Sequence, residues 1–219
     1  MPNITNNALR RSMKSHEYIV ISGFNRSKVG KIIGSAASVI SGILVFVILT
    51  ILEHYSYFES KSVLTPTVCS LISAGSIYLG LYSYFDSKMW KWKLISKHIN
   101  VPDLSGEWEC TARGRDLKGN VTDWEAKIEI YQSWDKVHIH LQTKSSSSDS
   151  IAASIIFDGE SGYRLVYNYQ NRPRIDEEEL TPHMGFAELT FHKNLTTAEG
   201  EYFNGRGRNT FGTMKLRRI

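Results

Sequence analysis

Cationic side chains recur in the connecting segments of the C-terminal half of this 219-residue chain. The guanidinium group of arginine presents a planar fork of N–H donors that matches two oxygens of a phosphate, and lysine adds a compact charge. Where alternate connections of an antiparallel sheet meet at one end, such cations ring one opening and attract an anionic ligand. The cations assigned to that opening are Arg113, Arg115, Lys118, Lys144, Arg172, Arg174, Arg206 and Arg208.

Aromatic and small polar residues occupy neighbouring strand positions that alternation predicts to point inward. Aromatic rings offer faces on which nucleobases stack, so rings beside cations suit a ligand that combines bases with phosphates. The same rings are also expected if they simply fill the interior of a barrel. The candidate ligand-binding residues are Arg113, Trp124, Lys144, Tyr167, Tyr169, Tyr202, Asn204, Arg206, Arg208 and Thr210.

Catalytic and metal-binding patterns are weak by comparison. His138 and His140 form an H-x-H pair on one strand, but without an evident third ligand they are interpreted as solvated histidines. The G-R-G stretch at 205–207 opens no helix, which argues against a phosphate-cradling loop. We find no nucleophile elbow, kinase motif or zinc signature. The sequence therefore predicts a binding protein and not an enzyme, with no metal and no cofactor other than its ligand.

The elements that position these residues are predicted strands. From residue 103 onward apolar and polar residues alternate, which indicates strands with one buried and one solvated face. Eight such antiparallel strands most simply close into an up-and-down barrel, and a two-sheet sandwich is the alternative. The predicted strands span 106–113, 122–132, 136–144, 150–158, 163–170, 185–192, 198–204 and 209–217.

Two uncharged apolar runs precede the strands, at 32–52 and 62–85. About 20 apolar residues in a helix cross a ~30 Å hydrocarbon core, so we expect a two-helix transmembrane hairpin over 32–85. Buried helices of a soluble domain are the alternative. The remaining divisions are an N-terminal arm at 1–31, a juxtamembrane linker at 86–102 and a β-barrel ligand-binding domain at 103–219.

Charge is distributed unevenly along the chain. Residues 1–98 hold 11 Lys and Arg against 4 Asp and Glu, whereas residues 99–219 hold 15 against 18. The positive charge thus flanks the apolar runs, which places both termini and the barrel in the cytoplasm. The net charge of −3 on the C-terminal part argues against direct DNA or RNA binding.

Small residues recur at helical spacing within the predicted spans. Such faces let helices approach closely in lipid, either within the hairpin or between protomers, although Gly and Ser are also common in these helices without that role. The candidate helix-packing residues are Gly34, Ser38, Gly42, Ser76 and Gly80.

The order of these parts, together with the segments VPDLSGEWECTARG, FAELTFHKN, GEYFNGRGR and GTMKLRR, resembles a bacterial effector family. It is the SMODS-associated two-transmembrane, β-strand-rich effectors of CBASS antiphage operons. The more specific pieces are the G-x-W at Gly106 and Trp108 and the G-x-Y-F at Gly200, Tyr202 and Phe203. G-x-W openings also occur in lipocalin-like barrels.

This resemblance implies a multi-pass protein of the bacterial inner membrane whose cytosolic barrel binds a cyclic dinucleotide or related cyclic oligonucleotide made by a partner nucleotidyltransferase. Binding would drive homo-oligomerisation through the spans, disruption of the lipid membrane and abortive infection. Two alternatives remain open: a membrane-tethered barrel for an apolar ligand, and a structural interaction module.

Overall fold

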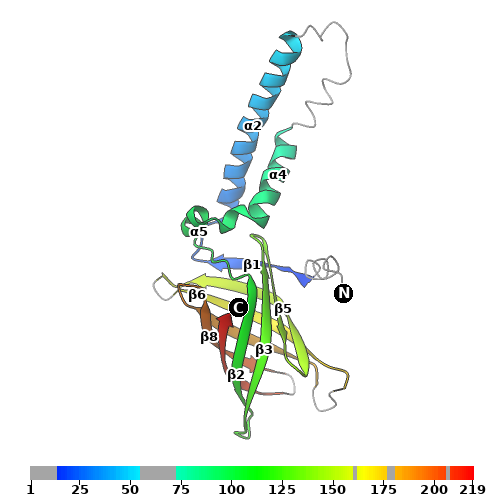
Figure 1. The fold of residues 1–219 in the computed structure, drawn as a ribbon, viewed down its shortest axis with the longest axis vertical. Helices are drawn as coiled ribbons and strands as arrows, with labels where there is room; N and C mark the ends of the chain where they lie inside the picture. The colour runs from blue at the N-terminus through cyan, green and yellow to red at the C-terminus, as the bar shows by residue number, and fades with distance from the viewer. Residues whose placement is uncertain (1–13, 55–72, 160–161, 177–180, 206–207) are drawn as a thin grey trace. The chain divides into compact units, whose positions relative to one another are not determined.

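The strands from Gly106 onward pair in chain order around a closed sheet (Figure 1). The computed structural model describes residues 14–54, 73–159, 162–176, 181–205 and 208–219. Each strand pairs antiparallel with the next, and the last pairs with the first. These strands are β2 (Gly106–Arg115), β3 (Val121–Gln132), β4 (Lys136–Gln142), β5 (Ser146–Phe157), β6 (Tyr163–Pro173), β7 (His183–Phe191), β8 (Thr197–Asn204) and β9 (Phe211–Arg218).

A ninth strand, β1 (His16–Ile21), fills a gap in this sheet. β4 and β5 pair directly at His140–Asp149, Leu141–Ser148 and Gln142–Ser147. Beyond these pairs the two strands are bridged by β1, which pairs antiparallel with β4 and parallel with β5. The expected closure is present, but the predictions of eight strands and of an entirely antiparallel sheet are wrong. Residues 16–21, expected in a separate arm, belong to the sheet.

One end of the barrel is filled by large side chains. Trp108 is fully buried, with its ring edge-on to Phe191 and its Nε1 donating to the carbonyl of Leu104 at 3.2 Å. Gln132 ties three segments together there, because it donates to the hydroxyl of Tyr18 and to the carbonyl of Pro102 and accepts from the amide of Leu104. Tyr18 thereby anchors β1 in the core. Further apolar residues complete this filling: Ile128, Ile130, Ile139, Ile155, Leu165 and Leu189.

The start of β1 is held at the seam by polar side chains. Asp149 of β5 accepts from Lys14 at 2.5 Å, and its other oxygen lies 3.0 Å from His138 and 2.9 Å from His140. His16 lies 2.8 Å from the hydroxyl of Ser150. The prediction of solvated histidines is wrong for His138, which is 4% exposed at this seam.

The helical part of the chain is a separate unit. It contains α2 (Arg26–His54) and α4 (Ala74–Ser87), and ends with the short 3₁₀ helix η2 (Met89–Lys91). The next helix, α5 (Lys93–Ile99), belongs to the unit that carries the strands. Within the described residues, α2 is long and apolar enough to cross a membrane over Arg26–Ile51.

The second expected span is described in part. Residues 62–72 lie outside the described residues, and α4 has 14 residues, which corresponds to about 21 Å of helix. Of the small residues predicted to pack helices, Gly34 lies beside the ring of Tyr78. Ser38 and Ser76 are exposed, and among the described residues no side chain lies within 4 Å of a Cβ placed at Gly42 or Gly80. The buried positions of α2 are instead Val29, Ile33, Ala37 and Ser41.

We predict that acid weakens the seam. Burial opposes ionisation of Asp149, but the bonds from Lys14 and His140 outweigh it and lower its pKa to about 2. A carboxylate whose folded pKa lies below its unfolded value stabilises the fold above pH ~4, and this contribution, roughly 2 kcal/mol, is lost as pH falls toward 2. Burial also lowers the pKa of His138. The neutral imidazole therefore stabilises the fold above about pH 6.5, the pKa of an unfolded histidine, and this stabilisation is lost as pH falls through the folded pKa.

The measurement is the unfolding temperature of the detergent-purified chain between pH 7 and pH 2, followed by tryptophan fluorescence. Asp149→Asn should lower that temperature at pH 7 and flatten its fall below pH 4. Asp176→Asn, at an exposed ion pair with Arg174, is the matched control. Parallel pH profiles for the native chain and Asp149→Asn would contradict the prediction.

Candidate functional site

A cavity of about 360 Å³ occupies the end of the barrel opposite Trp108. It is lined by residues of all eight strands from β2 to β9, together with the turns that join them at this end. Seven of the ten residues predicted from sequence line it, because alternation assigned their inward direction correctly. These are Trp124, Tyr167, Tyr169, Tyr202, Asn204, Arg208 and Thr210.

Glycines on β2 and β7 make room for two of the tyrosines. A Cβ at Gly114 would lie 2.6 Å from the hydroxyl of Tyr202, and a Cβ at Gly185 would lie 2.4 Å from the ring of Tyr169. Any larger residue at these positions would push a ring out of place. The cavity therefore depends on small residues that face large ones across the sheet.

Hydrogen bonds orient the side chains of the cavity. The indole Nε1 of Trp124 donates to the hydroxyl of Tyr202 at 2.9 Å, and the two rings meet edge to face. Tyr169 donates to the Oδ1 of Asn204 at 2.8 Å, and the Nδ2 of Asn204 donates to Thr210 at 2.8 Å. These bonds bring the predicted residues together in two short chains.

The tyrosines of the cavity stay neutral. Burial raises the pKa of Tyr167, Tyr169 and Tyr202, and the charge of Arg208 offsets this only in part for Tyr169 and Tyr202. Each phenol therefore keeps its proton at neutral pH and contributes an O–H group together with an aromatic face.

Asn171 and His183 were missed, because the strands predicted from sequence ended at 170 and began again at 185. Asn171 is 7% exposed; its Nδ2 donates to Ser146 at 3.1 Å, and its Oδ1 has no hydrogen-bond partner among the described residues. Burial lowers the pKa of His183, whose Nδ1 donates to the carbonyl of Thr181 at 3.0 Å. Both residues face each other across β6 and β7. Extending the alternation of each strand past the predicted turn would have found them.

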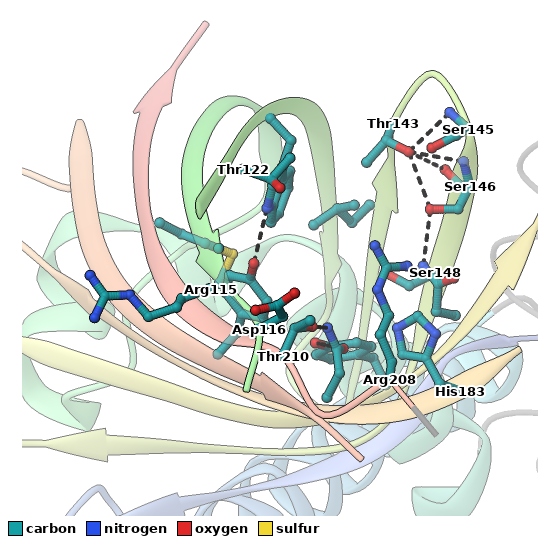
Figure 2. A pocket seen from close by; sticks show the side chains of 18 of the residues that line it. Arg115, Asp116, Thr122, Thr143, Ser145, Ser146, Ser148, His183, Arg208 and Thr210 are labelled. Atoms are coloured by element: carbon teal, nitrogen blue, oxygen red, sulfur yellow. Dashed lines mark hydrogen bonds between the residues drawn. The ribbon is translucent and has the colours of Figure 1, made fainter. Parts of the chain in front are cut away.

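Hydroxyl groups form the wall nearest the β4–β5 turn. The strands predicted from sequence end at 144 and begin again at 150, but Ser146 and Ser148 lie on β5 and line the cavity (Figure 2). Thr143 closes the turn, because its hydroxyl accepts from the amides of Ser145 and Ser146. The serines enter a strand despite their low β propensity since β6 pairs with them.

The cations divide between the inside and the outside of the barrel. Arg208 lines the cavity; Arg115, at the end of β2, also contributes to the lining, but its side chain is exposed and points away from the other lining groups (Figure 2). Arg113, expected there, points outward, because the inward residues of β2 are its even-numbered neighbours, and it pairs with Asp123 at 2.8 Å. Lys144 is exposed and lines a second hollow outside the wall, so its expected place in the cavity is also wrong. Arg206 lies outside the described residues.

The arrangement suits binding. It combines aromatic faces, neutral hydroxyl and amide groups, an unpaired amide oxygen and guanidinium charge, which are the groups that recognise bases and phosphates. Within the described ranges, no three His, Cys, Asp or Glu side chains are placed to hold a metal ion.

Two models of one protein family match the chain. Residues 99–218 match the family model "Cap15, cyclic dinucleotide receptor domain", and residues 27–91 match "Cap15, TM helices". The CD-NTase-associated protein 15 of Yersinia aleksiciae is 52% identical over 207 residues, which cover 94% of this chain and 99% of that protein. The protein of the same name from Staphylococcus schleiferi is 29% identical over 156 residues, covering 71% of this chain and 77% of its own.

The chain thus has an N-terminal transmembrane-helix domain followed by a strand-rich cyclic dinucleotide receptor domain, which defines a membrane-associated receptor of antiviral defence. It belongs to the Cap15 family, and the resemblance to CBASS effectors is confirmed.

We predict that the hydrogen bond from Trp124 to Tyr202 stabilises the fold. Tyr202→Phe removes the acceptor for the indole N–H and should lower the free energy of unfolding by about 1 kcal/mol. Urea unfolding of the detergent-purified chain measures this loss, and Tyr131→Phe, on the exposed outer face of β3, provides the control. Equal stability of the two variants would show that the bond contributes nothing.

Proposed function

We propose that this chain is a CBASS effector that binds a cyclic dinucleotide or related cyclic oligonucleotide in the cavity. The observation that carries the proposal is the coincidence of aromatic faces, Arg208 and the unpaired Oδ1 of Asn171 in one cavity of the receptor-domain match. One base stacks against the tyrosines, Arg208 binds a phosphate, and Asn171 accepts from an N–H on the edge of the base.

An apolar ligand fits this cavity less well. It would leave the oxygen of Asn171 unpaired and would offer no anionic group to Arg208. A cyclic dinucleotide carries both the N–H donors and the phosphates that these groups require. The polar lining therefore supports the nucleotide over a fatty acid.

The proposal includes the membrane steps. Two helices cross the inner membrane, both termini and the barrel lie in the cytoplasm, and ligand drives assembly of protomers that disrupts the membrane and ends infection. The supporting observations are the match of 27–91 to transmembrane helices and the positive flanks of the apolar runs. Protomer contacts through Gly42 and Gly80 fit the finding that, within the part of the chain that the structure describes, no atom lies within 4 Å of a Cβ placed at either residue.

Ligand binding is tested by titrating cyclic di-AMP, cyclic di-GMP and mixed-base cyclic dinucleotides into the detergent-purified chain. At least one should raise its unfolding temperature. Arg208→Glu should weaken binding of that ligand at least tenfold, because a charged hydrogen bond contributes roughly 1.5–3 kcal/mol. Lys136→Glu makes the same charge change at the start of β4, away from the cavity. If no cyclic oligonucleotide binds the native chain, the proposal fails.

Assembly is tested in liposomes that contain the chain and a trapped dye. Gly42→Leu should reduce dye release and cross-linking after addition of the ligand several-fold, because the larger side chain separates the helices, while ligand affinity stays unchanged. Leu44→Phe enlarges an exposed side chain on another side of α2 and is the control. Undiminished release from Gly42→Leu would remove this helix face from the proposal.

A further inference from the structure

The barrel wall is incomplete at the end that holds the cavity. β3 spans Val121–Gln132, but β4 pairs with the half from 127 to 132. Residues 121–126 pair with β2 along one edge, and no described strand pairs with their other edge. β4 ends at Gln142 and turns back through 143–145. The wall therefore has an opening between 121–126 and the turn at 143–145, which we term the notch.

The notch adjoins the cavity. A hollow of about 700 Å³ includes residues on both sides of the notch and extends over β2 and β9, and Trp124, Thr143 and Ser145 line both this hollow and the cavity. Figure 2 shows Thr122 on one hairpin and Thr143 and Ser145 on the other, on opposite sides of the cavity. The ring of Trp124 thus belongs to the boundary between an inner and an outer hollow.

Cations line the outer hollow. Its charged groups are Arg113, Lys144 and Lys215 against Asp123 and Glu125. The guanidinium of Arg113 is bound by both oxygens of Asp123, at 2.8 and 3.3 Å, and the ammonium of Lys215 lies 3.7 Å from Glu199.

The ammonium of Lys144 has no ion pair among the described side chains. Thr143 and Ser145, its neighbours in the chain, carry hydroxyl groups and line the same hollow. An unpaired ammonium beside hydroxyl groups is suited to bind a phosphodiester.

The size of the inner cavity gives the second argument. At about 360 Å³ it lies near the lower limit of small-molecule sites, which range from about 300 to 1,000 Å³. A cyclic dinucleotide places two bases on opposite sides of a ring that contains two phosphates. One nucleotide suits the cavity, and the other half of the ring needs a continuous space outside it. The notch provides that space.

We propose that the notch is the second nucleotide subsite of the ligand, an inference that rests on the proposed function. The outer base lies against Trp124, and its phosphodiester binds Lys144 and Lys215. The edge of β3 at 121–126 offers backbone N–H and C=O groups to the outer base. Trp124 contacts both halves of the ligand.

The test compares a ligand that fills both subsites with one that fills the cavity alone. The best-binding cyclic dinucleotide and the matching nucleoside 5′-monophosphates are titrated into the detergent-purified full-length chain. Lys144→Glu and Lys215→Glu should each weaken the cyclic dinucleotide about tenfold and leave monophosphate affinity within twofold. Glu125→Gln, which removes an anion from the notch, should tighten the cyclic dinucleotide. Lys136→Glu is the charge-matched control.

The outcomes separate the two proposals. Failure of the native chain to bind any cyclic dinucleotide would overturn the proposed function. A second outcome is tight binding by the native chain and the same affinity in all three variants, Lys144→Glu, Lys215→Glu and Lys136→Glu. This outcome would be consistent with the proposed function but would overturn the notch subsite. A monophosphate that loses affinity in parallel with the cyclic dinucleotide would also overturn it, because the lysines would then act on the cavity.

Discussion

Closure of the sheet depends on β1. β4 and β5 pair directly at three positions, and β1 supplies the pairing that completes the seam. Unpaired strand edges expose backbone groups that either bind water or recruit another chain, so a gap of this length would expose the barrel to aggregation. Tyr18 fixes β1 to the filled end of the core, and Lys14 fixes its start to Asp149. A segment distant in sequence thus completes the receptor domain.

The strand that completes the receptor domain, β1, directly precedes the first membrane helix in the chain. Residues 22–25 separate the last residue of β1 from the first residue of α2. β5 borders both functional regions, because Ser146 and Ser148 line the cavity while Asp149 and Ser150 hold the start of β1. A shift of β5 on ligand binding would therefore act on the strand that leads directly into the membrane helix.

The two ends of the barrel differ because they are built from different residues on the same strands. The filled end has apolar residues, with polar groups bonded internally as in the network of Gln132. At the other end, the buried oxygen of Asn171 accepts no hydrogen bond from any residue that the structure describes, and an oxygen left in that state costs about 1–3 kcal/mol. Such a cost is expected at a binding site, where the ligand supplies the missing partner.

Local alternation was enough to predict most of the strands and the inward direction of Trp124, Tyr167, Tyr169 and Tyr202, because strand periodicity is a property of adjacent residues. β1 was missed because its pairing partners lie more than 100 residues away and its own sequence is short.

Asn171 and His183 were missed because pairing with neighbouring strands extends β6 and β7 beyond the point where turn residues ended the pattern. Lys144 was placed in the wrong hollow because the early end of β4, and hence the notch, follows from unequal strand lengths that no single strand reveals.

Ligand-driven assembly requires a difference in affinity between two states of the protein. A ligand that binds the resting and the assembled state equally shifts nothing, whereas a tenfold preference supplies about 1.4 kcal/mol for each protomer. The described structure offers one place for such a difference to arise: the turn at 143–145 lines both hollows, and β5 runs from that turn to the seam with β1. On the proposed function, a ligand that held this turn against Trp124 would bias the position of β5. Modest preferences are sufficient, because contacts between small-residue faces of membrane helices are individually weak and repeat in every protomer of an assembly.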